Sequence, residues 1–308
     1  MTHEISITGA TGFVGKHLIK RLITEGYKDI RIIFREEEQR EDGQYGRAVT
    51  KTKIDLTNEF SIPIIAETHT LIHLAYAKDN FDANLKIASN IIKAARQGHI
   101  QRIIHCSTAV VSGFLKRGPV SETDPPHPLP GYQMNKYLIE QMFLAELPPQ
   151  IELAILRPSM IVGPGGGGLE SIAKRILFKP FLSHIMYWLL KNRRLNFVAV
   201  ENVIEAILMF IRIPHISSRE MYLISDDDDP DNYYGSVEKL VRKCLGKPPI
   251  WPDLGLPLCW LRLMFNFLPM HAPPNLSYLI NKLSSLGYRR RISLKHCIMN
   301  SIRGVQID

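Results

Sequence analysis

Cysteine is scarce in this sequence, and the few cysteines that occur stand apart from one another. The four are Cys106, Cys244, Cys259 and Cys297, and no Cys-x-x-Cys spacing occurs among them. Isolated cysteines of this kind indicate neither a zinc site nor a disulfide framework, and they fit a reducing compartment. We therefore expect no metal site and a cytoplasmic protein.

The sequence also lacks a long uninterrupted apolar run. Its start has neither the basic region nor the apolar core of a signal peptide, so we expect no export. The most apolar late segment, 254–270, is interrupted by Pro257, Arg262 and Pro269 and is too short to span a membrane. We expect a buried helix there, with a segment lying along a membrane surface as the alternative.

Charge of one sign occurs only in short runs, although the formal net charge is +8. Basic and acidic residues are interleaved along the chain, which argues against a nucleic-acid partner. The one acidic run, from Asp226 to Asp229, is expected to be a solvated loop. No internal repeat or low-complexity tract occurs besides it.

The chain contains enough apolar residues to form a full hydrophobic core, namely 45% of its 308 residues. Short apolar runs alternate with amphipathic stretches, a pattern typical of strands and crossover helices in a doubly wound parallel α/β sheet. Helical faces are marked by Leu18 with Leu22, and by Leu138 with Met142 and Ala145. Strands are predicted at 4–8, 30–34, 70–74, 102–106 and 151–156.

The pattern changes after the last of these strands. A Pro/Gly loop at 158–168 leads into a less regular region with many aromatic residues and prolines. We expect a nucleotide-binding part over 1–165 that regains about 195–225. Residues 166–194 and 226–308 are expected to form a smaller, mostly helical substrate-binding part.

The glycine-rich sequence ISITGATGFVG, residues 5–15, lies between an apolar strand and an amphipathic helix. Gly9, Gly12 and Gly15 at three-residue spacing permit a tight turn and a close approach of a pyrophosphate to the backbone. The helix N-terminus adds unpaired N–H donors and a favourable dipole. This motif predicts dinucleotide binding.

Arg35 follows the second strand, where a site that prefers NAD usually presents an acidic residue to the ribose hydroxyls. A guanidinium at this place suits the 2′-phosphate of NADP, so we expect NADP or NAD with NADP favoured. Asp55 and Leu56 follow the next extended stretch and are candidates to receive the adenine.

Tyr132 and Lys136 are four residues apart at the start of a predicted helix, and Thr108 follows an earlier strand. The spacing places phenol and ammonium on one helical face. A tyrosine with a pKa of about 10 is a poor base, so the lysine and the positive charge of the cofactor are needed to lower it. Thr108 would hold the substrate oxygen against the phenol.

Several motifs together resemble the extended short-chain dehydrogenase/reductases, also called the NAD-dependent epimerase/dehydratase family. They are TGATGFVG, HLAYA at 73–77, CSTAVVSG at 106–113, YQMNK at 132–136, LRPSMIVGPG at 156–165 and FVAVENVIEAI at 197–207. The resemblance implies a Rossmann-like fold and Thr108 rather than Ser107 as the third catalytic residue. It implies cofactor contacts at Gly9, Thr11, Gly12, Phe13, Val14, Gly15, Leu74, Ala75, Tyr76, Tyr132, Lys136, Pro158 and Ser159.

Departures from the family pattern reduce the number of reactions that we expect this chain to catalyse. Thr108 is followed by Ala109 and Val110 rather than by the two acids of the sugar dehydratases, so dehydration is disfavoured. We expect a nucleotide-sugar 4-epimerase or 4-reductase, in which Arg193 or Arg194 pairs with the substrate diphosphate. A homodimer is implied by the resemblance only.

Two other functions stay open. VENV at 200–203 and the apolar segment 256–268 resemble the 3β-hydroxysteroid dehydrogenase branch, which favours a carbonyl reductase for an apolar substrate. A catalytically silent dinucleotide sensor on the same fold is a further alternative. The catalytic residues Thr108, Tyr132 and Lys136 argue against that last function.

Overall fold

The structure is a computed structural model that describes residues 3–35, 48–78, 80–113, 118–216, 219–267 and 273–303. The strands are β1 (His3–Thr8), β2 (Ile30–Phe34), β3 (Val49–Lys53), β4 (Thr68–His73), β5 (Arg102–Cys106), β6 (Pro119–Val120), β7 (Glu152–Pro158), β8 (Met160–Val162), β9 (Phe197–Ala199), β10 (Glu220–Ile224) and β11 (Ser277–Tyr278). The α-helices are α1 (Phe13–Thr24), α2 (Ser61–Ala66), α3 (Phe81–Gln97), α4 (Tyr132–Glu146), α5 (Gly167–Phe178), α6 (Pro180–Leu190), α7 (Val200–Arg212), α8 (Tyr234–Cys244), α9 (Leu258–Phe267), α10 (Asn281–Ser285) and α11 (Leu294–Arg303).

Seven strands form the main sheet in the order β10-β7-β5-β4-β1-β2-β3. The pairs from β7 through β5, β4, β1 and β2 to β3 are all parallel. The order reverses direction beside β1, which is the mark of a doubly wound sheet. The expected fold class is confirmed, and the five predicted strands correspond to β1, β2, β4, β5 and β7.

The chain divides into two compact units, each made of separate segments. The first comprises Met1–Val111, Pro128–Arg157 and Ala206–Tyr222, and the second comprises Ser112–His127, Pro158–Glu205 and Leu223–Asp308. The assignment of cofactor binding to one part of the chain and substrate binding to the other stays a prediction.

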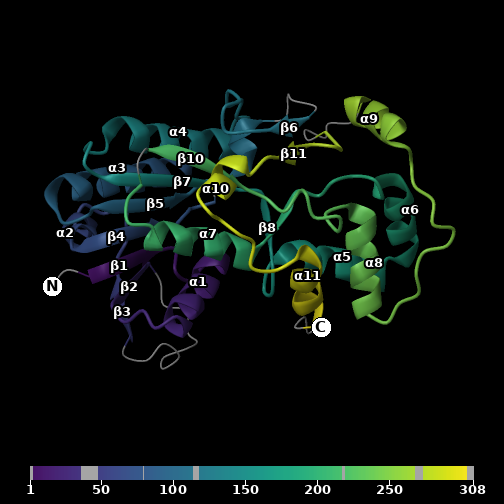
Figure 1. Cartoon of the computed structure of the whole chain (residues 1–308), viewed down its shortest axis with the longest axis horizontal. Helices are drawn as coiled ribbons and strands as arrows, with labels where there is room; N and C mark the ends of the chain where they lie inside the picture. The colour runs from purple at the N-terminus through teal and green to yellow at the C-terminus, as the bar shows by residue number, and fades with distance from the viewer. Residues whose placement is uncertain are drawn as a thin grey trace. The chain divides into compact units, whose positions relative to one another are not determined.

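In the first unit, helices cover both faces of the sheet. Figure 1 shows α2, α3 and α4 on one face, and α1 with residues 206–212 of α7 on the other. Because both faces are covered, successive residues of an inner strand can both be apolar and buried: Ile103 and Ile104 of β5 are both fully buried. In α1 the buried face consists of Gly15, Leu18, Ile19 and Leu22.

The buried face of α4 differs from the predicted one. The sequence favours Leu138, Met142 and Ala145, but Leu138 is 41% exposed and the helix instead buries Asn135, Lys136, Ile139, Glu140 and Phe143. The prediction was wrong because hydrophobic periodicity treats lysine and glutamate as surface residues. Here both are buried, and each has a specific partner described below.

In the second unit, α5, α8 and α11 pack with β8 and β9 around one apolar cluster that includes Ile172, Val237 and Ile298. A second cluster joins α6 to α9 through Tyr187, Leu190 and Leu261. Two short parallel pairs, β8 with β9 and β6 with β11, complete this unit.

The acidic run at 226–229 is not the solvated loop that the sequence predicts. Asp226 and Asp227 are buried, and their carboxylates accept hydrogen bonds from the backbone N–H groups of Ala199 and Tyr278 respectively. Because backbone donors need acceptors once they leave water, these two aspartates are part of the polar interior of the second unit. The prediction failed because a charge run carries no information about such partners.

Within the apolar segment 254–270, residues 258–267 form α9, which is not the buried helix that was expected. Leu261 is fully buried, whereas Leu258, Trp260 and Leu263 are exposed by 38%, 62% and 49%. Among the described residues, no helix is both long enough and apolar enough to cross a membrane.

Candidate functional site

The glycine turn connects β1 to α1 at the carboxyl edge of the sheet. Gly9 has a φ of +70°, and a Cβ atom there would lie 2.5 Å from the backbone nitrogen of Ala75. A Cβ on Gly15 would lie 2.4 Å from the carbonyl oxygen of Gly9. Only glycine therefore fits either position, and the turn can close tightly against the end of β4.

A pocket of about 330 Å³ lies beside this turn, within the first unit. It is lined by predicted residues that follow four strands, β1 to β4: Gly9, Thr11, Gly12, Arg35, Asp55, Leu56, Leu74, Ala75 and Tyr76. The lining also includes Ile33, Phe34, Ile54, Thr57, Ala77, Ala83 and Ile87, which the sequence did not single out. Ala83 and Ile87 are one helical turn apart on α3, so their spacing could have predicted that both lie on the same face of that helix.

The predicted cofactor residues Phe13, Val14 and Gly15 begin α1 rather than line this pocket. The N-terminal turn of α1 follows Gly12, so its unpaired N–H groups face the turn that lines the pocket. The conformation of the turn, the pocket and the helix N-terminus together fit a dinucleotide pyrophosphate.

Arg35 and Asp55 lie at the far end of the pocket, after β2 and β3. The Asp55 carboxylate accepts hydrogen bonds of 2.9 Å and 2.8 Å from the backbone N–H and the hydroxyl of Thr57. The Thr57 backbone bond, with Arg35 nearby, lowers the pKa of Asp55. Arg35 and Asp55 therefore contribute one basic and one acidic side chain to the lining of the pocket.

Tyr132 begins α4 directly after Gly131, whose φ is +89°. The phenol is 44% exposed, whereas Thr108 is buried. Partial burial and the neighbouring Cys106 thiol raise the pKa of Tyr132, and a hydrogen bond with the Thr108 side chain opposes them. The structure thus brings Tyr132 and Thr108 together, and it holds the phenol in its protonated form.

Lys136 is buried one turn along the same helix. Its Nζ donates a 2.9 Å hydrogen bond to the carbonyl oxygen of Cys106, at the end of β5. Burial lowers the pKa of Lys136. The lysine that the sequence predicts beside the tyrosine is therefore fixed to the sheet rather than left in solvent.

Tyr76 lies between these two residues and contacts both. The Lys136 Nζ is 4.5 Å from the centroid of the Tyr76 ring. The rings of Tyr76 and Tyr132 meet edge to face, with centroids 5.2 Å apart and planes at 88°. The sequence placed Tyr76 near the cofactor only by its motif, and gave no sign of these two contacts.

Two buried histidines pack behind the site. His73 at the end of β4 bonds with the Thr8 hydroxyl at 2.7 Å, and its ring stacks on His105 at 5.2 Å. Burial, with the Lys136 charge nearby, lowers the pKa of His73 to about 3. His73 is thus a packed, neutral, hydrogen-bonded residue.

A pair of buried amides ties the loop after β4 to α4. The Asn84 side chain bonds with both backbone groups of Ala77 and donates to Asn135 at 3.1 Å. Asn135 in turn donates to the carbonyl of Phe81. Because Ala77 directly follows Tyr76, this network fixes Tyr76 relative to the helix that carries Tyr132. Sequence reasoning missed both asparagines, since polar residues in helices usually face solvent.

The remaining predicted residues belong to the second unit. The Ser159 N–H donates to the Ile224 carbonyl, immediately after Pro158 ends β7. The Arg194 guanidinium lies 4.7 Å from the Tyr233 ring centroid and donates to the Tyr233 hydroxyl at 2.7 Å. Burial lowers the pKa of Arg193. Both arginines are partly buried rather than fully solvated.

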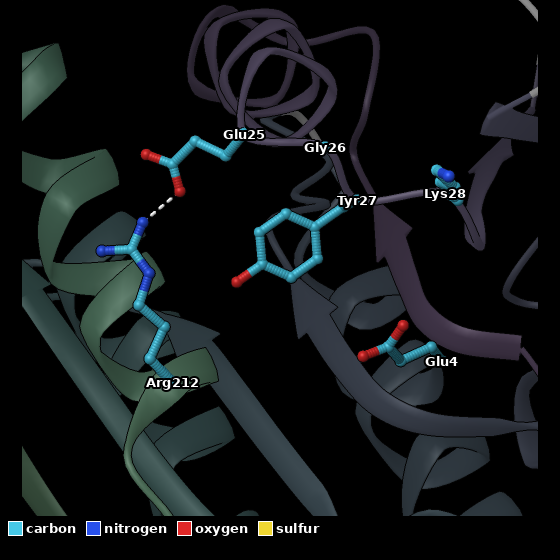
Figure 2. A pocket seen from close by; sticks show the side chains of 6 residues that line it. All are labelled: Glu4, Glu25, Gly26, Tyr27, Lys28 and Arg212. Carbon is cyan, nitrogen blue, oxygen red and sulfur yellow. Dashed lines mark hydrogen bonds and ion pairs between the residues drawn. The ribbon is translucent and has the colours of Figure 1, made fainter.

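A second pocket, shown in Figure 2, lies at the opposite edge of the sheet, at the start of β1 and of β2. It is lined by Glu4, Glu25, Gly26, Tyr27, Lys28 and Arg212. Glu25 pairs with Arg212 across it. Ligands of doubly wound sheets bind at the carboxyl ends of the strands, so the pocket beside the glycine turn is the better candidate.

Comparison with known proteins assigns the chain to a family. A family model described as NAD dependent epimerase/dehydratase family matches residues 5–225. UDP-glucose 4-epimerase of Vibrio cholerae is 26% identical over 279 residues, which is 82% of this chain and 80% of that protein.

Two solved structures share the fold over nearly their whole length. UDP-glucuronic acid 4-epimerase from Bacillus cereus in complex with NAD has a TM-score of 0.74 at 19% identity, and the match covers 98% of each chain. UDP-glucose 4-epimerase with UDP-glucose from Thermotoga maritima has a TM-score of 0.73 at 18% identity, again over 98% of each chain.

Proposed function

Since the chain belongs to the NAD dependent epimerase/dehydratase family and is an enzyme of the extended short-chain dehydrogenase/reductase type, we propose that it is a nucleotide-sugar 4-epimerase or 4-reductase. The observation that carries this proposal is its similarity to a UDP-glucose 4-epimerase over four-fifths of both chains. The proposed catalytic residues are Thr108, Tyr132 and Lys136, and the proposed cofactor pocket is the one beside Gly9.

A bound nicotinamide dinucleotide supplies the acceptor and donor of hydride. When hydride leaves the sugar carbon, the Tyr132 oxygen takes the proton of the hydroxyl on that carbon, which yields a keto sugar. In the reverse step, Tyr132 returns the proton to the keto oxygen. Its raised pKa favours the protonated form that this second step needs. The first step needs the positive charge of Lys136 close by.

Thr108 and the two arginines have supporting roles in this proposal. Thr108, which already bonds with the Tyr132 phenol, would share the substrate hydroxyl and hold it against that phenol. Arg193 or Arg194 would pair with the substrate diphosphate, because a guanidinium binds phosphate oxygens in a bidentate manner. Pro158 and Ser159 would contact the nicotinamide.

The difference between an epimerase and a reductase lies in the fate of the keto sugar. An epimerase lets the keto sugar turn over and receive hydride on its other face, so the cofactor is regenerated. A reductase releases its product and needs fresh reduced cofactor. Denaturing the purified protein and measuring the released nucleotide by mass spectrometry separates the two. Nearly one nucleotide per chain supports the epimerase, and an empty site that binds added NADPH supports the reductase.

The substrate class is tested directly by incubating the protein with UDP-glucose and following the formation of UDP-galactose by NMR. Conversion without added cofactor supports the epimerase. If nucleotide sugars are inert while an apolar ketone is reduced with NADPH, the alternative of a hydroxysteroid-type reductase replaces this proposal. If neither nucleotide binds to the protein, the proposal is wrong as a whole.

A preference for NADP is part of the proposal and depends on Arg35. Arg35 lies in the pocket lining, and its positive charge suits a 2′-phosphate. Calorimetric titration with NAD and NADP is expected to show tighter binding of NADP, and Arg35→Ser should remove the difference. Asp55→Asn is the matched control at the same end of the pocket. Equal affinities in the original protein would contradict the preference.

A homodimer is a further part of the proposal. The helix α4 leaves Met134 and Leu138 exposed by 36% and 41%, although its opposite face is buried. Light scattering should give the mass of two chains, and Leu138→Glu should reduce it to one. A monomeric original protein overturns this part alone.

Contact with an anionic membrane surface is proposed for α9. The helix exposes Trp260 and Leu263, and Arg262 is exposed beside them. Aromatic and apolar side chains next to a cation fit an interfacial helix. Flotation with phosphatidylglycerol vesicles should recover the protein, and Trp260→Glu should abolish the recovery while Phe60→Glu, in the other unit, leaves it unchanged. Absence of the original protein from the vesicles contradicts this contact.

A further inference from the structure

The buried ammonium of Lys136 has two direct contacts of different kinds. One is the hydrogen bond of 2.9 Å to the Cys106 carbonyl oxygen, and the other is the face of the Tyr76 ring, with Nζ 4.5 Å from the centroid. Only 4% of Lys136 is exposed, so water cannot stabilise its charge. An aromatic face attracts a cation more strongly where both are removed from water.

Two titratable groups near Lys136 also favour its charged form. Glu140, on the next turn of α4, raises the pKa of Lys136, but its carboxylate is already bound by Arg157 in two hydrogen bonds. Cys106 also raises that pKa, and burial keeps its own thiol protonated. The neighbouring His73 and His105 are neutral because burial lowers the pKa of each.

The Tyr76 ring, rather than its hydroxyl, makes the useful contacts. The hydroxyl is buried and has no hydrogen-bond partner within the described part of the chain. Burial, with Tyr132 nearby, raises the pKa of Tyr76 to about 12, so the hydroxyl stays neutral. The ring meets the Lys136 ammonium with its face, and it meets the Tyr132 ring in an edge-to-face contact.

We propose that Tyr76 is a positioning residue for the catalytic pair, whose ring keeps the Lys136 ammonium charged and fixed beside Tyr132. This inference rests on the proposed function for its consequence in catalysis, but the contact itself can be tested without substrate. Tyr76 is held in turn by its own backbone, because Ala75 abuts Gly9 and Ala77 is bound by Asn84. The glycine turn and the catalytic lysine are therefore connected through a single residue.

The test is an NMR titration of the lysine side chains, labelled with ¹³C at Cε, in the full-length protein. The Lys136 resonance is assigned as the one that disappears in Lys136→Met. In Tyr76→Leu, which removes the aromatic face, the pKa of Lys136 is expected to fall by about one unit. In Tyr76→Phe, which keeps the ring, that pKa should stay unchanged. Tyr27→Leu, in the pocket of Figure 2, is the remote control.

A graded series avoids the risk that the leucine variant fails to fold. Phenylalanine analogues with increasing fluorine content at position 76 keep the shape of the ring and weaken its negative face. The pKa of Lys136 should decrease step by step with each fluorine. An unchanged pKa along this series overturns the proposal, as does a decrease in Tyr76→Phe as large as that in Tyr76→Leu.

The kinetic consequence gives an independent measurement. Where Lys136 loses its charge, turnover is lost, so the alkaline limit of turnover should move to lower pH in Tyr76→Leu and stay in place in Tyr76→Phe. A merely structural defect would lower the rate at every pH without moving that limit, and this result would overturn the proposal. If the original protein binds no dinucleotide, the proposed function fails, while the lysine titration still decides the role of Tyr76.

Discussion

Glu140 of α4 and Arg157 of β7 form a bidentate ion pair that is almost completely removed from solvent. The Nε and Nη2 atoms of Arg157 donate to Oε1 and Oε2 of Glu140 at 3.0 Å and 2.5 Å. The side chains are 0% and 2% exposed. Glu140 is one helical turn beyond Lys136, so the pair fixes α4 to β7 beside that lysine.

We predict that Glu140→Gln lowers the free energy of unfolding by about 3–5 kcal/mol, because it leaves the Arg157 charge buried without a counter-ion. Urea denaturation measures this loss. The double variant Glu140→Leu with Arg157→Leu removes both charges and should recover most of the stability. A single variant as stable as the original protein would show that the pair is solvated in solution.

Gly9→Ala tests the close approach of the glycine turn to β4. The added Cβ would lie 2.5 Å from the Ala75 nitrogen, on a residue whose φ is +70°. We expect a loss of stability on the order of 1–3 kcal/mol and a weaker affinity for dinucleotide, measured by calorimetry. Gly167→Ala is the control, since its Cβ would meet no atom within 4 Å. That variant should keep its affinity, and a Gly9→Ala variant that binds normally contradicts the proposed pocket.

The sheet was predictable because its strands are buried on both faces and therefore contain adjacent apolar residues. Ile32, Ile33 and Phe34 of β2, and Ile103 and Ile104 of β5, carry this signal. The glycine turn was predictable for a related reason, because a close backbone approach excludes every side chain. In both cases the structure restricts which residue types can occupy the position, so the restriction is visible in the sequence.

The parts of the site that depend on polar partners were not predictable in this way. Asn84 and Asn135 look like surface residues of two helices, yet they bond with each other and with the loop that carries Tyr76. Glu140 was missed for the same reason. A buried polar residue differs from an exposed one only by its partner, and that partner is distant in the sequence.

Tyr132→Phe tests the proposed proton transfer. The variant loses only the hydroxyl, so the edge-to-face contact with Tyr76 can remain. Turnover should fall by roughly 100- to 10,000-fold, while calorimetry should give an unchanged affinity for dinucleotide. Tyr137→Phe, on the same helix, is the matched control and should keep full activity. Retained turnover in Tyr132→Phe would remove this residue from the mechanism.

Asp226 is the group whose titration should be visible in the stability of the second unit. Its carboxylate accepts hydrogen bonds from the Ala199 N–H and the Asn202 amide, and it pairs with Arg290 at 2.9 Å. These contacts favour the charged form. Burial outweighs them and raises the pKa of Asp226 to about 6.

We predict that this raised pKa makes folding less favourable as the pH increases from about 4 to about 6. In that range the folded protein holds a proton on Asp226 that the unfolded chain has already released, so each pH unit costs about 1.4 kcal/mol. The stability difference between the original protein and Asp226→Asn, measured by urea denaturation at each pH, isolates this contribution and should decrease over the range. If the difference for Asp226→Asn instead increases with pH, the Arg290 contact dominates and the carboxylate is ionised in the folded protein.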